Sequence, residues 1–215
     1  MSRYVLQTTA SGLCLEDTFS DQHPTLLDFT SGQFNYRLKK GGGRRELLAK
    51  AVGAKDGTNV IDCTAGLGRD AFLLASLGCR VTMIERSPVV ALLLDDALER
   101  ALHHEDLAET VARIELVSGN AIDYLNDVQT VPEVIMLDPM FPARKKSARV
   151  KGDMQMMQRF LGTDGDVDTL FAAAYSSGCS RVVLKRPLHD KYELPIKPTN
   201  TLRGGSIRFD VFVIS

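Results

Sequence analysis

Short apolar runs rich in valine and isoleucine alternate with stretches of helical periodicity from about residue 56 onward. Runs of this kind, separated by segments of helix length, are typical of strand and helix units around a mostly parallel sheet. Several runs are apolar at nearly every position, which favours strands covered on both faces. The predicted strands are residues 59–63, 80–85, 113–117, 134–138 and 181–185.

Two of the intervening helices have recognisable ends. We expect Ser87 to cap a helix that begins at Pro88, because a serine side chain accepts a backbone amide and proline suits the first helical position. Apolar residues then recur at helical spacing, namely Val90, Leu94, Ala97 and Ala101. A second helix is predicted to start at Asp166 or Asp168 and to end before Gly178.

The last part of the chain has a different pattern. Residues 192–197 and 207–214 are strand candidates, and the loop between them, residues 198–205, is rich in turn residues and leaves no room for a helix. Two strands joined in this way pair antiparallel. The pattern therefore predicts an α/β fold in which five parallel strands are closed by an antiparallel C-terminal hairpin.

Residues 1–40 precede this unit and contain short alternating pieces, such as residues 4–8. These pieces predict a small strand-rich N-terminal lobe. Gly41, Gly42 and Gly43 form a candidate hinge between the lobe and the main domain, residues 41–215.

Composition limits the function classes. A chain of 215 residues, 44% of them hydrophobic, can bury one good core. Its formal net charge of −1 gives no overall attraction to nucleic acid or to anionic membranes, so any basic function must be local. Without a signal peptide, a membrane-length apolar run or a C-x-x-C pair, we expect a cytoplasmic protein with free thiols. No metal site is expected, because His103 and His104 are adjacent and point apart on a helix.

A glycine-rich turn follows the first predicted strand of the main domain. Gly66 and Gly68 remove side chains that would block a cofactor, and the next helix directs its positive end towards it. Glu85 ends the second strand 19 residues after Gly66, the distance at which a carboxylate reaches ribose hydroxyls. The turn also loosely matches a dinucleotide pattern, but Asp62 would repel a pyrophosphate and attract a sulfonium or an ammonium group. The alternatives are a turn cap for Asp62 and a solvated strand end for Glu85.

The fourth strand brings Asp138-Pro139-Met140-Phe141-Pro142 to the carboxyl edge of the sheet, where ligands of open α/β folds bind. These residues resemble the (Asp/Asn)-Pro-Pro-(Tyr/Phe) motif of amino-group methyltransferases, with Met140 in place of the second proline. The carboxylate of Asp138 and the carbonyl of Pro139 can accept the protons of an amine whose lone pair is delocalised, and Phe141 can stack on a base. The alternative is an ordinary proline turn with Phe141 in the core.

Basic residues cluster after this segment and also before the main domain. Such clusters in a chain of balanced charge favour contacts with RNA phosphates, and the alternative is a solvated face. The residues expected to bind RNA are Arg44, Arg45, Arg144, Lys145, Lys146, Arg149, Lys151 and Lys185. An apolar stripe at helical spacing, Val150, Met154, Met157 and Leu161, is expected to belong to the core rather than to a substrate pocket.

Several motifs together resemble those of one family. They are residues 41–44, 48–53, 62–72, 85–86, 137–142 and 183–187. The combination resembles the ribosomal RNA small subunit methyltransferase J family, from about residue 41 to the end of the chain. The resemblance implies a class I, Rossmann-like methyltransferase fold, S-adenosylmethionine as cofactor, and methylation of the N2 amine of one guanosine in 16S ribosomal RNA.

The resemblance also assigns residues and partners. The residues implied at the cofactor or the reaction centre are Arg69, Asp70, Glu85, Arg86 and Asp138, with Gly119 and Asn120 near the adenine. The implied partner is small-subunit ribosomal RNA or the 30S particle. The rival hypotheses are a methyltransferase acting on adenine N6 or a protein glutamine, an NAD(P)-dependent oxidoreductase, and an RNA-binding module without catalytic activity.

Overall fold

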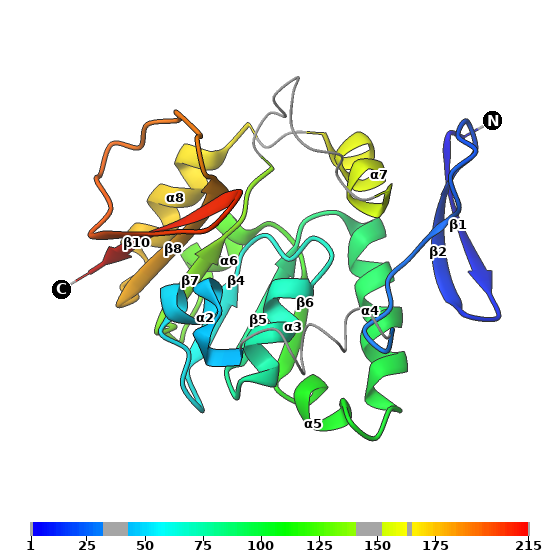
Figure 1. Cartoon of the computed structure of the whole chain (residues 1–215), viewed down its shortest axis with the longest axis horizontal. Helices are drawn as coiled ribbons and strands as arrows, with labels where there is room; N and C mark the ends of the chain where they lie inside the picture. Colours follow the sequence, from blue (N-terminus) through cyan, green and yellow to red (C-terminus); the bar gives the residue numbers. More distant parts are fainter. Residues whose placement is uncertain (1, 32–42, 141–151, 163–164, 215) are drawn as a thin grey trace.

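A seven-stranded sheet forms the centre of the protein in the computed structural model, which describes residues 2–31, 43–140, 152–162 and 165–214 (Figure 1). The strand order is β6-β5-β4-β7-β8-β10-β9. The strands are β4 (Asn59–Asp62), β5 (Arg80–Glu85), β6 (Ile114–Ser118), β7 (Val134–Leu137), β8 (Arg181–Pro187), β9 (Asn200–Arg203) and β10 (Ile207–Val213). The first five are parallel to one another, and β10 pairs antiparallel with both β8 and β9. The five predicted parallel strands are thus confirmed.

Helices cover both faces of this sheet, which explains the nearly continuous apolar runs. Along β7, Ile135 and Met136 belong to two different buried clusters, because successive side chains of a strand point to opposite faces. One cluster packs against α2 (Leu47–Val52), α3 (Arg69–Ser76) and α4 (Pro88–Leu102), and the other against α6 (Ala121–Asp127) and α8 (Val167–Ser176). The short η1 (Gly43–Arg45) and α5 (Ala108–Val111) complete the helices of this part of the chain, and α7 (Gly152–Leu161) precedes α8.

Both predicted helix starts are confirmed. Ser87 is the N-cap of α4, its hydroxyl accepts the amide of Val90 at 3.5 Å, and Pro88 is the first helical residue. The four apolar residues at helical spacing in α4 are all buried. Asp166 precedes α8, but its side chain makes no capping bond and pairs with Arg86 instead.

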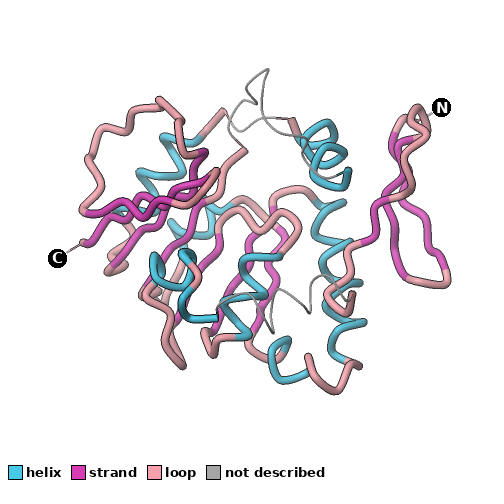
Figure 2. Tube along the Cα trace, viewed as in Figure 1, coloured by secondary structure: helices cyan, strands magenta, loops and turns pink. Residues whose placement is uncertain are grey.

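The predicted C-terminal hairpin is only partly correct. Residues 207–213 do form β10, one residue shorter than predicted, but the expected strand at residues 192–197 is wrong, and β9 lies inside the segment expected to be a loop (Figure 2). Two arginines explain the difference. Arg208 donates to the carbonyls of Leu188 and Asp190 at 3.0 Å each and so holds the chain just before the predicted strand. Arg186 donates to the carbonyl of Tyr192, the first residue of that strand, and so occupies a carbonyl that a strand ladder would need.

The strand-rich N-terminal lobe is confirmed as a three-stranded antiparallel sheet of β1 (Tyr4–Thr9), β2 (Gly12–Asp17) and β3 (Thr25–Leu26). It lies beside α4 (Figure 1). Arg100 of α4 donates to the carbonyl of Leu27 and forms an ion pair of 3.5 Å with Asp28. Phe29 then stacks on Phe72 of α3, with ring centroids 4.4 Å apart. The predicted boundary at residue 40 falls outside the described residues.

The four cysteines are buried and unbridged, as expected. No helix in the described part of the chain is both long enough and apolar enough to cross a membrane.

Candidate active site

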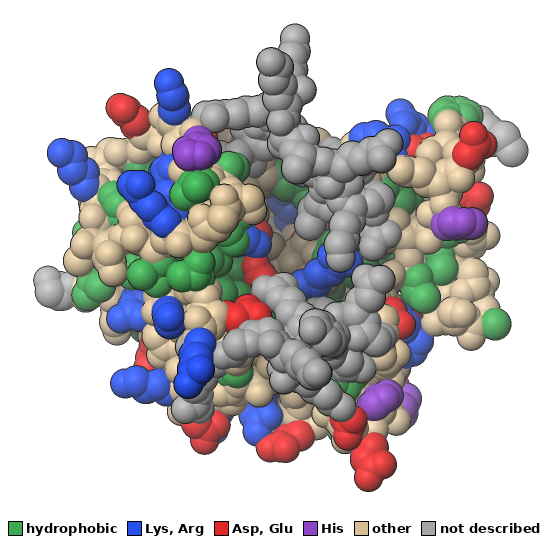
Figure 3. Space-filling view, viewed as in Figure 1, with side chains coloured by type: hydrophobic (Ala, Val, Ile, Leu, Met, Phe, Trp, Pro, Cys, Tyr) green, Lys and Arg blue, Asp and Glu red, His purple; other side chains and the backbone are tan. Residues whose placement is uncertain are grey.

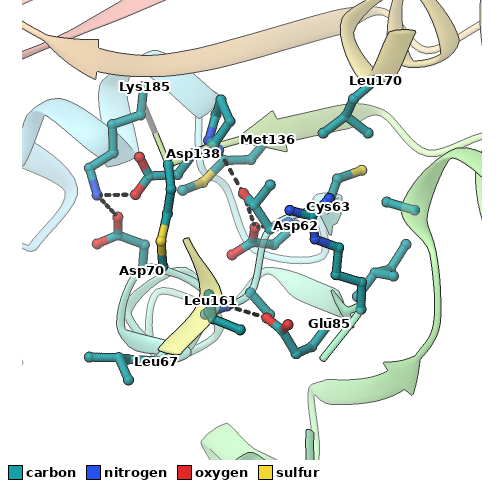
Figure 4. Close-up of a pocket in the computed structure, with 18 of the residues that line it drawn as sticks. Asp62, Cys63, Leu67, Asp70, Glu85, Met136, Asp138, Leu161, Leu170 and Lys185 are labelled. Carbon is teal, nitrogen blue, oxygen red and sulfur yellow. Dashed lines mark hydrogen bonds and ion pairs between the residues drawn. The ribbon is translucent and has the colours of Figure 1, made fainter. Parts of the chain in front are cut away.

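A cavity of about 570 Å³ lies at the carboxyl ends of β4, β5, β7 and β8. This is the edge at which open α/β sheets bind ligands, and the volume lies in the usual range for a small-molecule site. Asp62, Glu85, Asp138 and Lys185, one from the end of each of these strands, line the cavity together (Figure 4). Acceptors and a cation are thus gathered from segments far apart in the sequence.

Asp62 at the end of β4 is 2% exposed, and its Oδ1 accepts the amide of Thr64 at 3.1 Å. The Thr64 hydroxyl in turn accepts the amide of Asp138 at 2.6 Å, which ties the loop after β4 to the loop after β7. Burial raises the pKa of Asp62 to about 7, and the charges of Asp70 and Asp138 add to this shift. Asp62 therefore caps a turn and also leaves a buried carboxyl at the cavity wall that a cation would ionise.

Glu85 at the end of β5 is buried and fixes two loops. Its Oε2 accepts the amide of Gly66 at 2.9 Å, and its Oε1 accepts the amide of Ser87 at 2.8 Å. Because a carboxylate has about four acceptor positions, Glu85 can also accept hydroxyl protons from a ligand in the cavity. The solvated strand end considered for Glu85 is wrong, since the residue is only 5% exposed.

The two glycines of the turn have different roles. Gly66 lines the cavity and has a φ of 52°, and among the described residues a Cβ there would meet only the carbonyl of Thr64, at 3.7 Å. Gly68 does not line the cavity, and a Cβ there would lie 2.8 Å from Leu94 and 3.0 Å from Phe29. The expectation that Gly68 makes room for a cofactor is not what its surroundings indicate. It makes room for the core between α3, α4 and the N-terminal lobe.

Lys185 of β8 forms two ion pairs inside this site. Its Nζ is 2.6 Å from Oδ2 of Asp70 and 2.7 Å from Oδ2 of Asp138 (Figure 4). Burial opposes the charge on Lys185, but the carboxylates of Asp138 and Asp70 outweigh it and raise the pKa of the lysine above its usual value. The ammonium therefore joins α3 to the loop after β7.

Comparison with known proteins gives the family. The family model described as "Putative SAM-dependent methyltransferase" matches residues 1–214. A ribosomal RNA small subunit methyltransferase J from Tolumonas auensis is 49% identical over 195 residues, which cover 89% of this chain and 78% of that protein. Its counterpart from Thioalkalivibrio sulfidiphilus is 47% identical over 214 residues, covering 97% and 84%.

The chain belongs to the ribosomal RNA small subunit methyltransferase J family. A solved structure of a SAM-dependent methyltransferase from Neisseria gonorrhoeae is 37% identical, with a TM-score of 0.77, and the match covers 97% of this chain and 81% of that one. The predicted class I fold is confirmed. The cofactor of this methyltransferase family is S-adenosylmethionine.

The cavity fits that cofactor chemically. Buried carboxyls at Asp62 and Glu85 stand at its wall, where one can neutralise a cationic group and the other can accept hydroxyl protons. Four other residues implied by the resemblance also line it, namely Arg69, Asp70, Arg86 and Asn120. Asn120 caps α6 by accepting the amide of Ile122 at 2.8 Å. Gly119 lies outside the lining, where its amide donates to the carbonyl of Glu85 at 2.9 Å.

The remaining predicted residues of this family member are divided between described and masked segments. Pro139 is buried and lines the cavity beside Asp138. Arg45 of η1 is exposed, and the side chain of Arg44 is not described. Phe141, Arg144, Lys145, Lys146, Arg149 and Lys151 lie outside the described residues.

Three parts of the cavity wall were missed by the sequence interpretation. Met157 and Leu161 of α7 line the cavity, so the expectation that their stripe stays out of a pocket is wrong, whereas the expected packing in the core is correct. Met157 is at the same time 1% exposed and part of the main core. Ile207, which begins β10, and Thr64 also line the cavity. The position of α7 directly after the Asp138 segment was the available signal.

Proposed function

We propose that this enzyme transfers the methyl group of S-adenosylmethionine to the exocyclic N2 amine of a guanosine in small-subunit ribosomal RNA. The relatives' names supply the RNA. The observation that carries the chemistry is the position of Asp138 and Pro139 in the wall of the same cavity as Asp62 and Glu85. An enzyme of ribosomal RNA acts where ribosomes assemble, so we also propose a cytoplasmic location.

Asp138 and Pro139 prepare the amine. The lone pair of a nucleobase amine is delocalised into the ring, so the nitrogen is a weak nucleophile. Hydrogen bonds from its two N–H groups to the Asp138 carboxylate and the Pro139 carbonyl favour a pyramidal nitrogen with a localised lone pair. S-adenosylmethionine supplies the electrophilic methyl group when it is bound. Placement of the amine in line with that group accounts for much of the remaining acceleration.

Asp138 does not by itself choose between guanine and adenine. Its carboxylate can accept a proton from the exocyclic amine of either base, so methylation of adenine N6 is the alternative that the product analysis must test. The proposal of guanine rests on the resemblance of the motifs to the methyltransferase J family.

Glu85 and Asp62 are the residues that we propose to hold the cofactor. Glu85 is fixed by two backbone amides and accepts the ribose hydroxyls. Asp62, whose carboxyl is buried at the cavity wall, neutralises the cationic methionine portion. The other residues proposed for the cofactor are Gly66, Arg69, Asp70, Arg86 and Asn120, with Gly119 behind Glu85.

Surface charge supports one side of the molecule as the RNA-binding side. Lys and Arg side chains gather where β9 and β10 lie (Figure 3). The exposed basic residues of η1, α2, β9 and the loop before β9 are Arg45, Lys50, Lys191, Lys197 and Arg203. The opposite end of the sheet carries exposed carboxylates from α4 and α5, including Asp95, Glu99 and Glu109. RNA phosphates favour the first side and avoid the second.

Methylation assays with Asp138→Ala test the proposed function. Wild-type protein should form N2-methylguanosine in small-subunit RNA, supplied either deproteinised or as 30S particles. The substitution should reduce the rate by about 10² or more, because an acceptor needed in the transition state is lost. Calorimetric affinity for S-adenosylhomocysteine should stay close to that of the wild type.

Mass spectrometry of the nucleosides distinguishes the proposed guanine methylation from the rival hypotheses. N6-methyladenosine as the product would overturn the guanine assignment, and an active Asp138→Ala variant would overturn the role of the carboxylate. Binding of NAD(P)H in place of S-adenosylhomocysteine would favour the oxidoreductase.

A further inference from the structure

Lys185 is a charged residue of this cavity to which the amine-acceptor mechanism gives no role. Its ammonium pairs with Asp70 from the start of α3 and with Asp138 from the loop after β7, and its charge also acts on Asp62 at the end of β4. The side chains of Lys185, Asp70 and Asp138 are 21%, 15% and 37% exposed. At such partly buried positions, charges interact more strongly than at the surface.

Together these residues form a cluster of three carboxyl groups and one ammonium. The raised pKa of Asp62 reflects burial first and then the charges of Asp70 and Asp138, and Lys185 acts in the opposite direction. Removal of the ammonium would leave three carboxyl groups facing one another with less compensation. Like charges in such a cluster drive one or more of the groups to take up a proton.

Protonation would disable the acceptor. A protonated carboxyl carries a donor and has less capacity to accept, whereas an ionised carboxylate has about four acceptor positions. Lys185 uses Oδ2 of Asp138 at 2.7 Å, which is compatible with acceptance of amine protons by the same carboxylate. The second ion pair, to Asp70, fixes the position of the ammonium itself.

We propose that Lys185 is a positioning residue for methyl transfer, which is held by Asp70 and keeps the carboxylate of Asp138 oriented and charged for the substrate amine. This inference rests on the proposed function. It also differs from the phosphate contact that the sequence suggested for Lys185. A phosphate-binding lysine contributes to RNA affinity, but a positioning lysine contributes to the rate and to its dependence on pH.

Lys185→Gln and Lys185→Arg are the informative variants. Glutamine keeps two N–H donors for Asp70 and Asp138 without the charge, and arginine keeps the charge. Lys55→Gln is the matched control, because Lys55 is exposed in the loop before β4 and does not line the cavity. Thermal unfolding checks that all three variants fold.

The rate of methyl transfer should differ between the variants. With Lys185→Gln, kcat at pH 7 should fall about tenfold or more, and the acid limb of the pH profile should move up by about one unit, so that activity recovers as the pH rises. KM for the RNA should change by less than about threefold. Lys185→Arg should restore the position of the acid limb, and Lys55→Gln should resemble the wild type.

A second measurement does not depend on activity. The carboxyl carbons of labelled aspartate can be titrated by NMR, and Asp138→Asn identifies the signal of residue 138. In Lys185→Gln this signal should titrate at higher pH than in the wild type. Should the signal and the acid limb both stay in place, the proposal is overturned.

The outcomes also distinguish a failure of the positioning role of Lys185 from a failure of the proposed function. A higher KM for RNA with an unchanged acid limb would overturn the positioning role in favour of phosphate contact. A loss with Lys185→Arg equal to that with Lys185→Gln would show that the charge is not what matters. Absence of N2-methylguanosine from the wild-type reaction would instead refute the proposed function, and the NMR titration would still report on Lys185.

Discussion

Gly68→Ala should damage stability while leaving the cofactor site nearly intact. The residue has a φ of 68°, a region that costs alanine about 1 to 2 kcal/mol. Its new Cβ would lie 2.8 Å from Cδ2 of Leu94 and 3.0 Å from Cζ of Phe29, and overpacking of this kind costs roughly 1 to 3 kcal/mol. We therefore expect the free energy of unfolding to fall by about 2 to 5 kcal/mol, which corresponds to a Tm about 5 to 15 °C lower.

Gly66→Ala is the matched control for this substitution. Its φ of 52° imposes the same backbone cost, but within the described part of the chain the new Cβ would have only the carbonyl of Thr64 within 4 Å, at 3.7 Å. The loss of stability should thus be about 1 to 2 kcal/mol. Because Gly66 lines the cavity, the methyl group should weaken S-adenosylhomocysteine binding more than Gly68→Ala does.

Urea unfolding followed by circular dichroism and calorimetric titration with S-adenosylhomocysteine give the two readouts. The expected pattern is a crossover, with Gly68→Ala the less stable variant and Gly66→Ala the weaker binder. Equal stability of the two variants would refute the packing role of Gly68. Equal loss of affinity in both would mean that Gly68 also serves the cofactor.

Three further predictions concern single carboxylates. Since Asp62 has a pKa of about 7, its carboxyl is largely protonated below that pH and must lose the proton when the α-ammonium group of a ligand binds beside it. S-adenosylhomocysteine should therefore bind more weakly at pH 6 than at pH 8. Asp62→Asn should abolish this difference in calorimetry, and a persisting difference would exclude Asp62 as its source. Glu85→Ala removes the acceptor of two amides and of the proposed ribose contact, and should lower the affinity tenfold or more in the same assay, with unchanged affinity counting against ribose binding. Asp210→Ala deprives the buried guanidinium of Arg186 of a partner at 3.1 Å and should cost about 3 kcal/mol in urea unfolding; a cost below about 1 kcal/mol would contradict this account.

Local signals were sufficient for the parallel part of the sheet. β5 coincides with its predicted range, β4 and β7 end one residue earlier, and β6 is shifted by one residue, because apolar runs bounded by turn residues mark buried strands well. The turn chemistry at Ser87 fixed the start of α4 in the same way. The acidic ends of β4 and β5 and the motif at Asp138 identified the edge of the sheet at which the cavity lies.

Contacts between distant segments explain what could not be predicted. Residues 192–197 have strand-like composition, but Arg186 occupies the carbonyl of Tyr192, and Arg208 holds the chain just before it through the carbonyls of Leu188 and Asp190. Gly68 matches a cofactor pattern by spacing, and only the packing of Leu94 against the turn reveals its other purpose. Lys185 was interpreted as a phosphate ligand, because sequence alone does not show that Asp70 and Asp138 meet beside it.

The N-terminal sheet has a consequence for the shape of the cavity. Tyr4 meets Phe160 edge-on, with ring centroids 5.0 Å apart, and the hydroxyl of Thr25 lies 2.8 Å from the sulfur of Met156. Both partners belong to α7, the helix whose Met157 and Leu161 form one wall of the cavity. The N-terminal sheet thus supports that wall from behind, and a mutation that loosens β1 or β3 would change the affinity for the ligand although neither strand contacts it.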